Sequence, residues 1–417
     1  MIRQVLPPEI WIQIFRFATS MPATVYPSAV SSFDPQQLKD LRKFGFNYFR
    51  SLRAKSSISL VCNSWRYLVF PFLWEIVCLL PGKKYHIIGS ILQRYNAPRG
   101  THQLADDRRA GDYVRAIHVF EPENGYPHEL FDIANIQRII RYCPNLVTLT
   151  APEGWQLFTR HCHVSFQPST TLHEVHLSLM DEETIQKIFA RPERLLLLHG
   201  TSLAKARQER ETVLPAVHTL SMRPSDMEYR NIFAPSLSRW VIHDTIVGLC
   251  QTRAYQRHAT LITSLELACT WRGEQNIQSA LSGMSNLQEL AIHLDTMRLV
   301  PAPYSLPVTV RRLGLFCCYE KHGWVLDTNG GTFRWFLDRL GDWLDLAIRM
   351  RETLELLRFL DWKGVRLPKR SSAQRRSTYS EWWAERFLLF EQSGIKLQNQ
   401  DGNPLGIEIT RGSNGRY

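Results

Sequence analysis

Apolar residues recur in one short pattern, apolar-x-x-apolar-x-apolar, along most of the chain after residue 113. Because side chains alternate between the two faces of a strand, the last two apolar positions of each match lie on the same face. We therefore expect a short strand at each match, with that face turned toward the core. The matches, of which the fourth is incomplete, begin at Val114, Leu146, Leu172, Leu195, Val217, Leu237, Ile262, Leu287, Val310 and Leu354.

The spacing of these matches predicts a repeat architecture. Seven of the nine intervals between successive starts lie between 20 and 29 residues, which resembles the period of leucine-rich repeats. Segments with helical periodicity, such as 277–284 and 333–350, separate the matches. A strand and a helix that cannot bury their apolar faces alone must stack on neighbours. We predict an irregular leucine-rich-repeat-like α/β solenoid over 113–362. A compact α/β domain is the alternative, because the usual asparagine ladder is missing.

The residue between the last two apolar positions of each match must point to the opposite face of its strand. Stacked in parallel, these residues form one row, which we expect to be exposed on a concave surface that binds a protein substrate. The row has no strong charge of one sign, which favours a protein surface over a phosphate backbone as its ligand. Its members are His118, Thr150, His176, Ser221, Val241, Glu266, Ala291, Gly314 and Arg358.

The first twenty residues predict a helix with apolar side chains on two adjacent sides. Proline suits the first turn of a helix, and an acid there complements the helix dipole, as in Pro7-Pro8-Glu9. One apolar stripe is enough to dock a surface helix on its own core. Two stripes indicate burial on two sides, one of them available to a partner protein. The stripes are Ile10, Ile14 and Phe17 on one side, and Trp11, Phe15 and Ala18 on the other.

A second helix is predicted from Ser57 or Ser59 up to Pro71, which should break it. Between the two helices lies an insertion, residues 20–56. Within the insertion, Asp34-Pro35 is a suitable cap and first turn for a further helix, although Gly45 weakens that helix.

Four motifs, in this order along the chain, resemble an F-box. They are Leu6-Pro7-Pro8-Glu9-Ile10, the pair Ile14-Phe15, then Leu60-Val61-Cys62-Asn63-Ser64-Trp65-Arg66, and finally Leu73-Trp74. The family pattern is L-P-x-E-(I/L), I-F, V-C-x-x-W-R and L-W, and the resemblance covers roughly residues 5–80. The insertion of 37 residues departs from a typical F-box and resembles the F-box-like proteins of mushroom-forming fungi.

The resemblance implies a small all-α F-box over 1–95, ahead of the solenoid, and a non-catalytic role. F-box proteins bind a Skp-family adaptor, which links them to the cullin and RING subunits of an SCF-type ubiquitin ligase, while their repeats recruit a protein substrate. A repeat scaffold without ligase coupling is the alternative. Trp65 could instead be wholly internal. The family's adaptor contacts, carried onto this chain, are Leu6, Pro7, Ile10, Ile14, Leu60, Val61, Cys62 and Trp65.

The net charge is +11, and its position matters more than its size. Segment 39–55 carries +5 and segment 363–376 carries +6, which together equal the whole excess. Nucleic-acid-binding proteins usually spread basic charge along a face or groove. A nucleic-acid binder that uses these two runs is a second alternative. For 39–55 we expect instead a basic amphipathic helix that packs on the N-terminal helices, and for 363–376 a solvated loop, with a nuclear import signal as the other interpretation of its arginines and lysines. Residues 363–417 should form a basic loop, a capping helix that begins at Ser380 and ends at Gly394, and a tail.

The sequence offers little support for catalysis or for a bound cofactor. His173-Glu174-Val175-His176 is one residue short of a zinc-protease motif. His161 and His163 have no further candidate ligands nearby, and no phosphate-binding glycine motif occurs. The eight cysteines form no C-x-x-C pair, which fits a reducing cytoplasmic or nuclear compartment. The longest apolar stretch, 67–80, is too short to cross a bilayer, so we expect no membrane partner. From the missing motifs we expect no metal and no cofactor.

Overall fold

The computed structural model describes seventeen segments of the chain. They are 6–19, 33–79, 84–96, 109–119, 139–150, 172–176, 179–180, 195–199, 202–203, 211–222, 224–229, 231–242, 249–267, 276–294, 302–317, 331–360 and 373–405. The chain divides into two compact units, each described separately below. The first comprises 1–25, 40–217 and 229–234, and the second comprises 26–39, 218–228 and 235–417.

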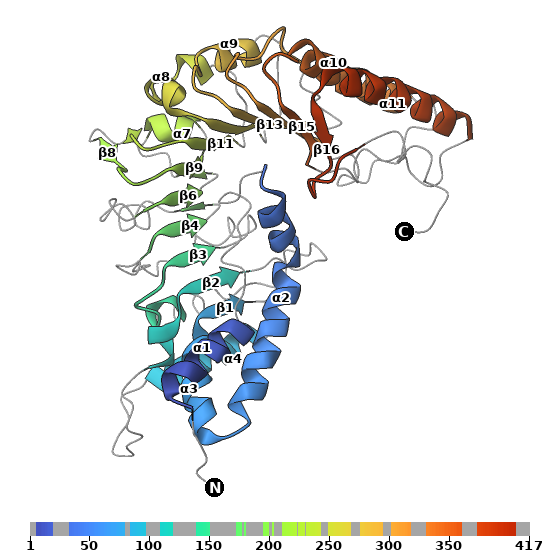
Figure 1. The fold of residues 1–417 in the computed structure, drawn as a ribbon. Helices are drawn as coiled ribbons and strands as arrows, with labels where there is room; N and C mark the ends of the chain where they lie inside the picture. The colour runs from blue at the N-terminus through green and yellow to red at the C-terminus, as the bar shows by residue number, and fades with distance from the viewer. Residues whose placement is uncertain are drawn as a thin grey trace. The chain divides into compact units, whose positions relative to one another are not determined.

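Among its described residues, the first unit contains a sheet of five parallel strands that pair in sequence order (Figure 1). They are β1 (Ile76–Leu79), β2 (Ala116–Val119), β3 (Thr148–Thr150), β4 (Glu174–His176) and β6 (Leu197–His199). Two short parallel pairs join β5 (Leu179–Met180) to β7 (Ser202–Leu203) and β8 (Thr212–Val213) to β10 (Ile232–Phe233).

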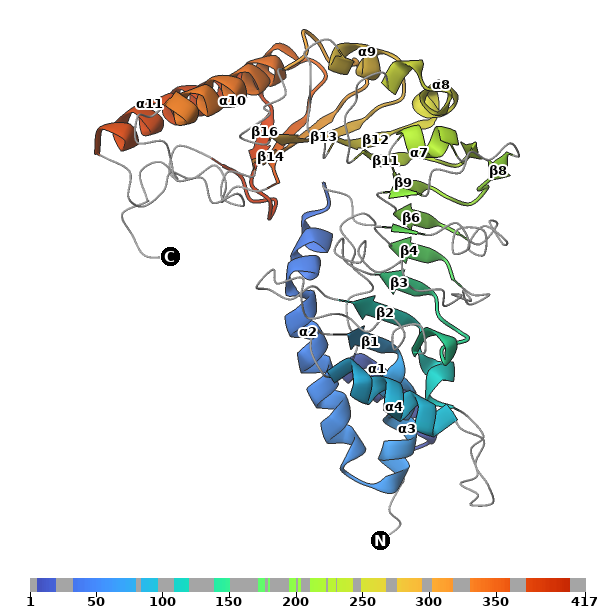
Figure 2. The same cartoon turned by 180° about the vertical axis from the view of Figure 1, so that it is seen from behind.

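Helices of the first unit gather near β1. They are α1 (Pro8–Thr19), α2 (Pro35–Ser59), which belongs to this unit from Asp40, α3 (Asn63–Trp74), α4 (Lys84–Asn96) and the 3-10 helix η1 (Ala110–Tyr113). Figures 1 and 2 agree that α1, α3 and α4 lie at the β1 end of the sheet, with α2 beside β1 and β2.

The second unit contains seven parallel strands, again paired in sequence order. They are β9 (Thr219–Ser221), β11 (Arg239–Ile242), β12 (Ser264–Leu267), β13 (Glu289–Leu294), β14 (Arg312–Cys317), β15 (Leu356–Phe359) and β16 (Lys396–Gln398). Helices α8, α9, α10 and α11 follow one another along the same side of these strands (Figure 2). The helices of this unit are α7 (Pro224–Tyr229), η4 (Leu249–Gln251), α8 (Arg253–His258), η5 (Ala259–Leu261), α9 (Asn276–Ser282), α10 (Gly331–Arg349) and α11 (Ala373–Ser393).

The protein is therefore of the mixed α/β class with parallel sheets, as the hydrophobic pattern predicts. The prediction that residues 1–95 are all-α is wrong, because β1 lies within them and pairs with β2. The parallel strands also extend beyond the predicted end at 362, since β16 pairs with β15. Each of the ten matches contains one of the paired strands, from β2 to β15. The central apolar position of each match is buried, and in each sheet these positions stand in register on neighbouring strands, as Leu265, Leu290 and Leu313 do. Removing such a buried leucine side chain costs about 2–5 kcal/mol, so burial of these aligned rows stabilises each sheet.

In three places, a polar side chain in the turn before one strand donates a hydrogen bond to the turn before the preceding strand. Asn145 Nδ2 donates to the carbonyl of Asp112 at 2.8 Å, and Asn286 Nδ2 donates to that of Thr260 at 2.6 Å. Thr263 Oγ1 makes the equivalent bond at 3.2 Å, to a carbonyl 25 residues earlier. Mixed side chains thus satisfy turn carbonyls that a regular asparagine ladder would otherwise bind.

Two helix boundaries differ from the sequence prediction. The predicted second helix does not begin at Ser57 or Ser59, which lie in α2, but after Cys62, and it runs through Pro71 to Trp74. Proline removes a helical hydrogen bond, but it is close to the end of α3, where burial of Phe72 supports the last turn.

The C-terminal helix is also longer than predicted. Helix α11 begins at Ala373, not Ser380, so the end of the expected basic loop 363–376 is helical. Burial of Trp383 and Phe387 stabilises the helix, and the high helix propensity of alanine, glutamine and arginine favours its longer N-terminal part. Gly394, with a φ of 76°, follows its last residue as expected. Residues 363–372 and the tail after 405 lie outside the described residues.

Candidate partner-binding surface

Helix α1 packs one of its two predicted apolar stripes on α3 through Trp11 and Phe15, whereas Ala18, the third predicted member, is exposed. Phe15 is 2% exposed and packs with Val69 and Phe72 of α3. The ring of Trp65 lies 4.6 Å from that of Trp11 and 5.1 Å from that of Phe15, measured between centroids. These side chains form the core of the α1–α3 pair.

The second stripe of α1 is open to solvent. Ile10 is 40% exposed, Ile14 43% and Phe17 87%. A helix docked only on its own core carries polar residues on its outer side. A group of exposed apolar side chains is typical of a surface that another protein covers.

The segment between α2 and α3 exposes two further apolar side chains, Leu60 at 76% and Val61 at 60%. Their backbone N–H groups donate to the carbonyls of Ser57 and Ile58 at 3.2 Å each, which forms a turn. The Ile58 side chain packs against the α1–α3 core, so this turn is anchored to that core. We use the name apolar surface for six exposed residues: Leu6, Ile10, Ile14, Phe17, Leu60 and Val61.

Cys62 and Arg66 hold the turn in place. The Cys62 sulfur accepts the backbone N–H of Trp65 at 3.4 Å, which caps the start of α3. Arg66 Nε donates to the carbonyl of Ser59 at 3.2 Å. The motif around these residues therefore has a local structural role.

The structure separates the eight sequence-predicted adaptor residues into two groups. Trp65 is half-buried in the α1–α3 core. Phe17 was not among the eight, although it shares the spacing of Ile10 and Ile14, and that spacing is the signal that could have identified it. The exposed members are Leu6, Pro7, Ile10, Ile14, Leu60, Val61 and Cys62.

The predicted substrate row is aligned as expected within each sheet. His118, Thr150 and His176 pair in register in the first unit. In the second unit, register connects the remaining members in the order Ser221, Val241, Glu266, Ala291, Gly314 and Arg358. The side chain of His176 lies outside the described side chains.

The predicted exposure of this row is wrong. Glu266 is the one member with a described side chain that is not buried, and Arg358 is only 4% exposed. Residues of the 20–56 insertion cover part of the row, at His118, Ala291, Gly314 and Arg358. The Phe44 ring packs edge-on to His118 with centroids 5.1 Å apart, and Phe33 packs on Ala291. The buried members are His118, Thr150, Ser221, Val241, Ala291, Gly314 and Arg358.

Burial changes the chemistry of His118. Its Nδ1 lies 3.2 Å from the hydroxyl of Thr150, and desolvation lowers the pKa of the imidazole to about 4. His118 is therefore neutral at physiological pH.

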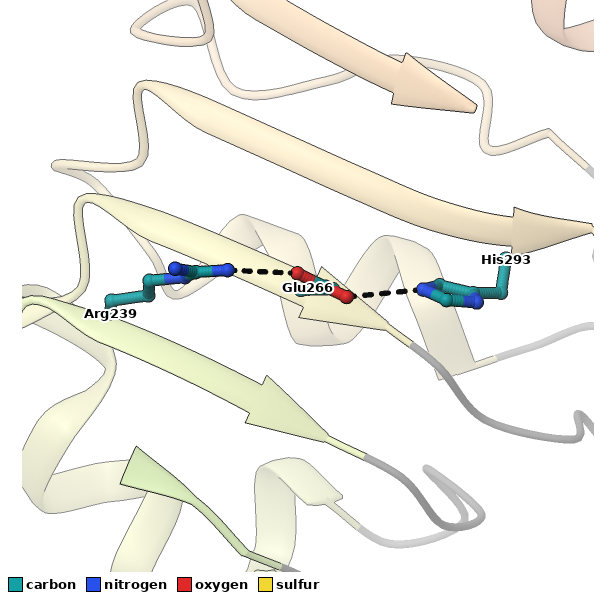
Figure 3. Close-up of polar contacts among 3 residues, drawn as sticks. All are labelled: Arg239, Glu266 and His293. Carbon is teal, nitrogen blue, oxygen red and sulfur yellow. Dashed lines mark hydrogen bonds and ion pairs between the residues drawn. The ribbon is translucent and has the colours of Figure 1, made fainter. Parts of the chain in front are cut away.

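Glu266 joins three neighbouring strands through its carboxylate (Figure 3). Arg239 Nη2 on β11 lies 3.0 Å from Oε2, and His293 Nε2 on β13 lies 3.1 Å from Oε1. The His293 ring stacks on Phe316 with centroids 4.0 Å apart. Because both carboxylate oxygens are engaged, one in an ion pair with Arg239 and the other in a hydrogen bond with His293, the cluster connects β11, β12 and β13.

In the part of the chain that the structure describes, no group of three or more histidine, cysteine, aspartate or glutamate residues could hold a metal ion. His173 immediately precedes β4 and His176 ends it, so neither belongs to the helix that a zinc-protease motif requires. His161 and His163 lie outside the described residues. None of the described helices is long and apolar enough to cross a membrane.

Comparison with known proteins yields no relative: no protein-family model, no curated protein and no solved structure matches this chain.

Proposed function

We propose that the protein recruits a protein substrate to an SCF-type ubiquitin ligase. In this proposal α1, α3 and the turn between α2 and α3 act as an F-box. They bind a Skp-family adaptor, which connects to the cullin and RING subunits. The observation that carries the proposal is the apolar surface, because Ile10, Ile14 and Phe17 are exposed on a helix whose other side is already buried.

The chemistry of the apolar surface fits a stable protein partner. Leucine, isoleucine, valine and phenylalanine side chains gain about 25 cal/mol for each Å² of apolar area removed from water. Arg16, on the same helix, has its guanidinium 5.8 Å from the centre of the Phe72 ring, so it packs back on the core beside the stripe.

We further propose that the parallel sheets are built from leucine-rich-repeat-like units that hold the substrate. The protein then needs no catalytic residue of its own. It holds a substrate lysine beside the charged conjugating enzyme and so raises the effective concentration of that lysine. Such a ligase subunit works in the cytoplasm or the nucleus.

A repeat scaffold without ligase coupling is the first alternative, and it predicts no adaptor binding. Nucleic-acid binding is the second alternative, and one observation disfavours it. Lys55, within the basic run 39–55, is 4% exposed, and desolvation lowers the pKa of its ammonium group. A buried lysine contributes little to phosphate binding, whose affinity would also fall steeply with salt.

The test is a pull-down of a purified Skp-family adaptor by the full chain. Ile10→Ala/Ile14→Ala should weaken adaptor binding about thirtyfold or more, since central interface residues contribute about 2 kcal/mol. Gln13→Ala is the matched control, because Gln13 is exposed on the same helix and is polar. Circular dichroism should show that both variants keep the fold.

Two results would contradict the proposal. A folded wild-type chain that binds no Skp-family adaptor would leave the scaffold alternative. Adaptor binding that Ile10→Ala/Ile14→Ala leaves unchanged would place the contact on another surface.

A further inference from the structure

Phe33 fills a small apolar cluster in the second unit, on the sheet face that carries the predicted substrate row. Its side chain is 6% exposed and packs with Ala291 and Leu360, while Phe316 and Leu356 pack around them. Phe33 belongs to the insertion, just before α2, and it is far from every one of these residues in the sequence.

The sheet also binds the backbone of Phe33. Arg358 Nη1 donates to the Phe33 carbonyl at 2.6 Å, across 325 residues of sequence. Its Nη2 donates to Oε1 of Gln398 at 2.5 Å, which holds the guanidinium in place. Burial lowers the pKa of Arg358, and the negative charge of Asp34 acts in the opposite direction.

A glycine provides the space for the ring. A Cβ atom added at Gly314 would lie 3.1 Å from Cζ of Phe33 and 2.6 Å from Cδ1 of Leu360. Any larger residue at this position would push against the ring or displace the leucine. We use the name Phe33 site for Ala291, Gly314, Leu356, Arg358 and Leu360.

We propose that the Phe33 site is a peptide-binding site for a phenylalanine of a partner protein, recognised through its ring and its main-chain carbonyl, and that Phe33 occupies it in cis. A specific contact for one side chain, combined with a hydrogen bond to the main chain, is the usual way in which folded domains recognise peptide segments. The same face carries the exposed ion pair of Arg312 Nη1 with Glu289 Oε1, 2.8 Å long, which supplies a polar surrounding.

Because Phe33 occupies the site in cis, a partner can bind there only when Phe33 is displaced. A tethered segment acts at an effective concentration on the order of millimolar. A partner segment must therefore compete with Phe33, and any event that withdraws the insertion would open the site. This inference goes beyond the ligase proposal and does not rest on adaptor binding.

The test uses a fluorescent synthetic peptide with the sequence of residues 28–37 and the full-length protein. The peptide should bind Phe33→Ala at least tenfold more tightly than wild type, as measured by fluorescence anisotropy. The same peptide with alanine in place of phenylalanine should not bind. Adding Gly314→Ala to Phe33→Ala should reverse the gain, because its methyl group enters the space of the ring.

Phe44→Ala is the matched control, since Phe44 is another buried phenylalanine encoded in the insertion and its removal should not create peptide binding. Equal binding of the peptide to wild type and Phe33→Ala, or none to either, would overturn the proposal. A Phe33→Ala chain that fails to fold would also overturn it, because the site would then never be empty in the folded protein. The adaptor pull-down is separate, so either proposal can fail alone.

Discussion

Two phenylalanines of α1 offer a direct test of how this helix is oriented. Phe15 and Phe17 are two positions apart, yet the first is 2% exposed and the second is 87% exposed. The same substitution at both positions, Phe15→Ala and Phe17→Ala, compares them with helix propensity held constant.

The expected costs follow from the contacts of each ring. Removing a buried phenylalanine side chain costs about 3–5 kcal/mol of unfolding free energy. Phe15 also loses ring contacts with Trp11 and Trp65, at centroid distances of 5.7 and 5.1 Å. Phe17→Ala should stay within about 0.5 kcal/mol of wild type, as exposed substitutions usually do.

The measurement needs local resolution, because a chain with two compact units need not unfold in one step. Hydrogen exchange followed by mass spectrometry on the full chain reports the opening of α1 and α3 separately. Phe15→Ala should increase exchange in both helices, whereas Phe17→Ala should leave exchange unchanged and weaken adaptor binding. Equal exchange in the two variants would refute the orientation of α1, and with it the apolar surface.

Three further predictions concern other parts of the protein. Burial lowers the pKa of His118 from 6.5 to about 4, so the contribution of its neutral form to stability is complete above pH 6.5 and is lost as the pH falls to 4. Between pH 7 and pH 4, the free energy of unfolding measured with urea should fall about 3 kcal/mol more in wild type than in His118→Gln. Equal decreases would contradict the burial of His118. Cys62→Ser should melt at a higher temperature than Cys62→Ala, because a hydroxyl is a better helix cap than a methyl group. Equal melting temperatures of the two variants would mean that a side-chain cap at this position contributes nothing to stability, and a Cys62→Ala variant that melts with wild type would mean the same for the 3.4 Å contact of the sulfur. Glu266→Lys should destabilise the protein more than Glu266→Gln, since it would place a second positive charge beside Arg239. A thermal melt in which both variants match wild type would show that the contacts of Glu266 are not stabilising.

The strands could be predicted because their signal is local. In each match, alternation along four to six residues determines which side chains share a face, and the core then selects the apolar face. The start of α2 at Pro35 was also predictable, since Asp34-Pro35 is a cap and first turn. The length of α2, 25 residues, could not be predicted. Gly45 lowers the helix propensity of this segment, and the burial of Phe44, which favours the helix, depends on residues distant in the sequence.

The exposure of the substrate row could not be read from the same pattern. Strand alternation correctly separates His118 from its neighbours Ile117 and Val119, but it says nothing about what covers the second face. Phe44, 74 positions before His118 in the sequence, provides that cover in the first unit, through contacts that no local pattern records. Sequence reasoning treated the insertion as a departure from the F-box pattern, yet residues of that insertion decide which sheet positions solvent can reach.

The residues most informative about function are those whose burial conflicts with their chemistry. Apolar surface residues and buried charged residues are both unusual, whereas a buried leucine is expected. Ile14 and Phe17 are apolar but exposed, and their exposure indicates a partner protein that would cover them. Arg358 is charged but 4% exposed, and it donates hydrogen bonds to Phe33 and Gln398 of the same chain. Both depend on what covers a surface, which is why a partner protein and the Phe33 segment are the subjects of the decisive experiments.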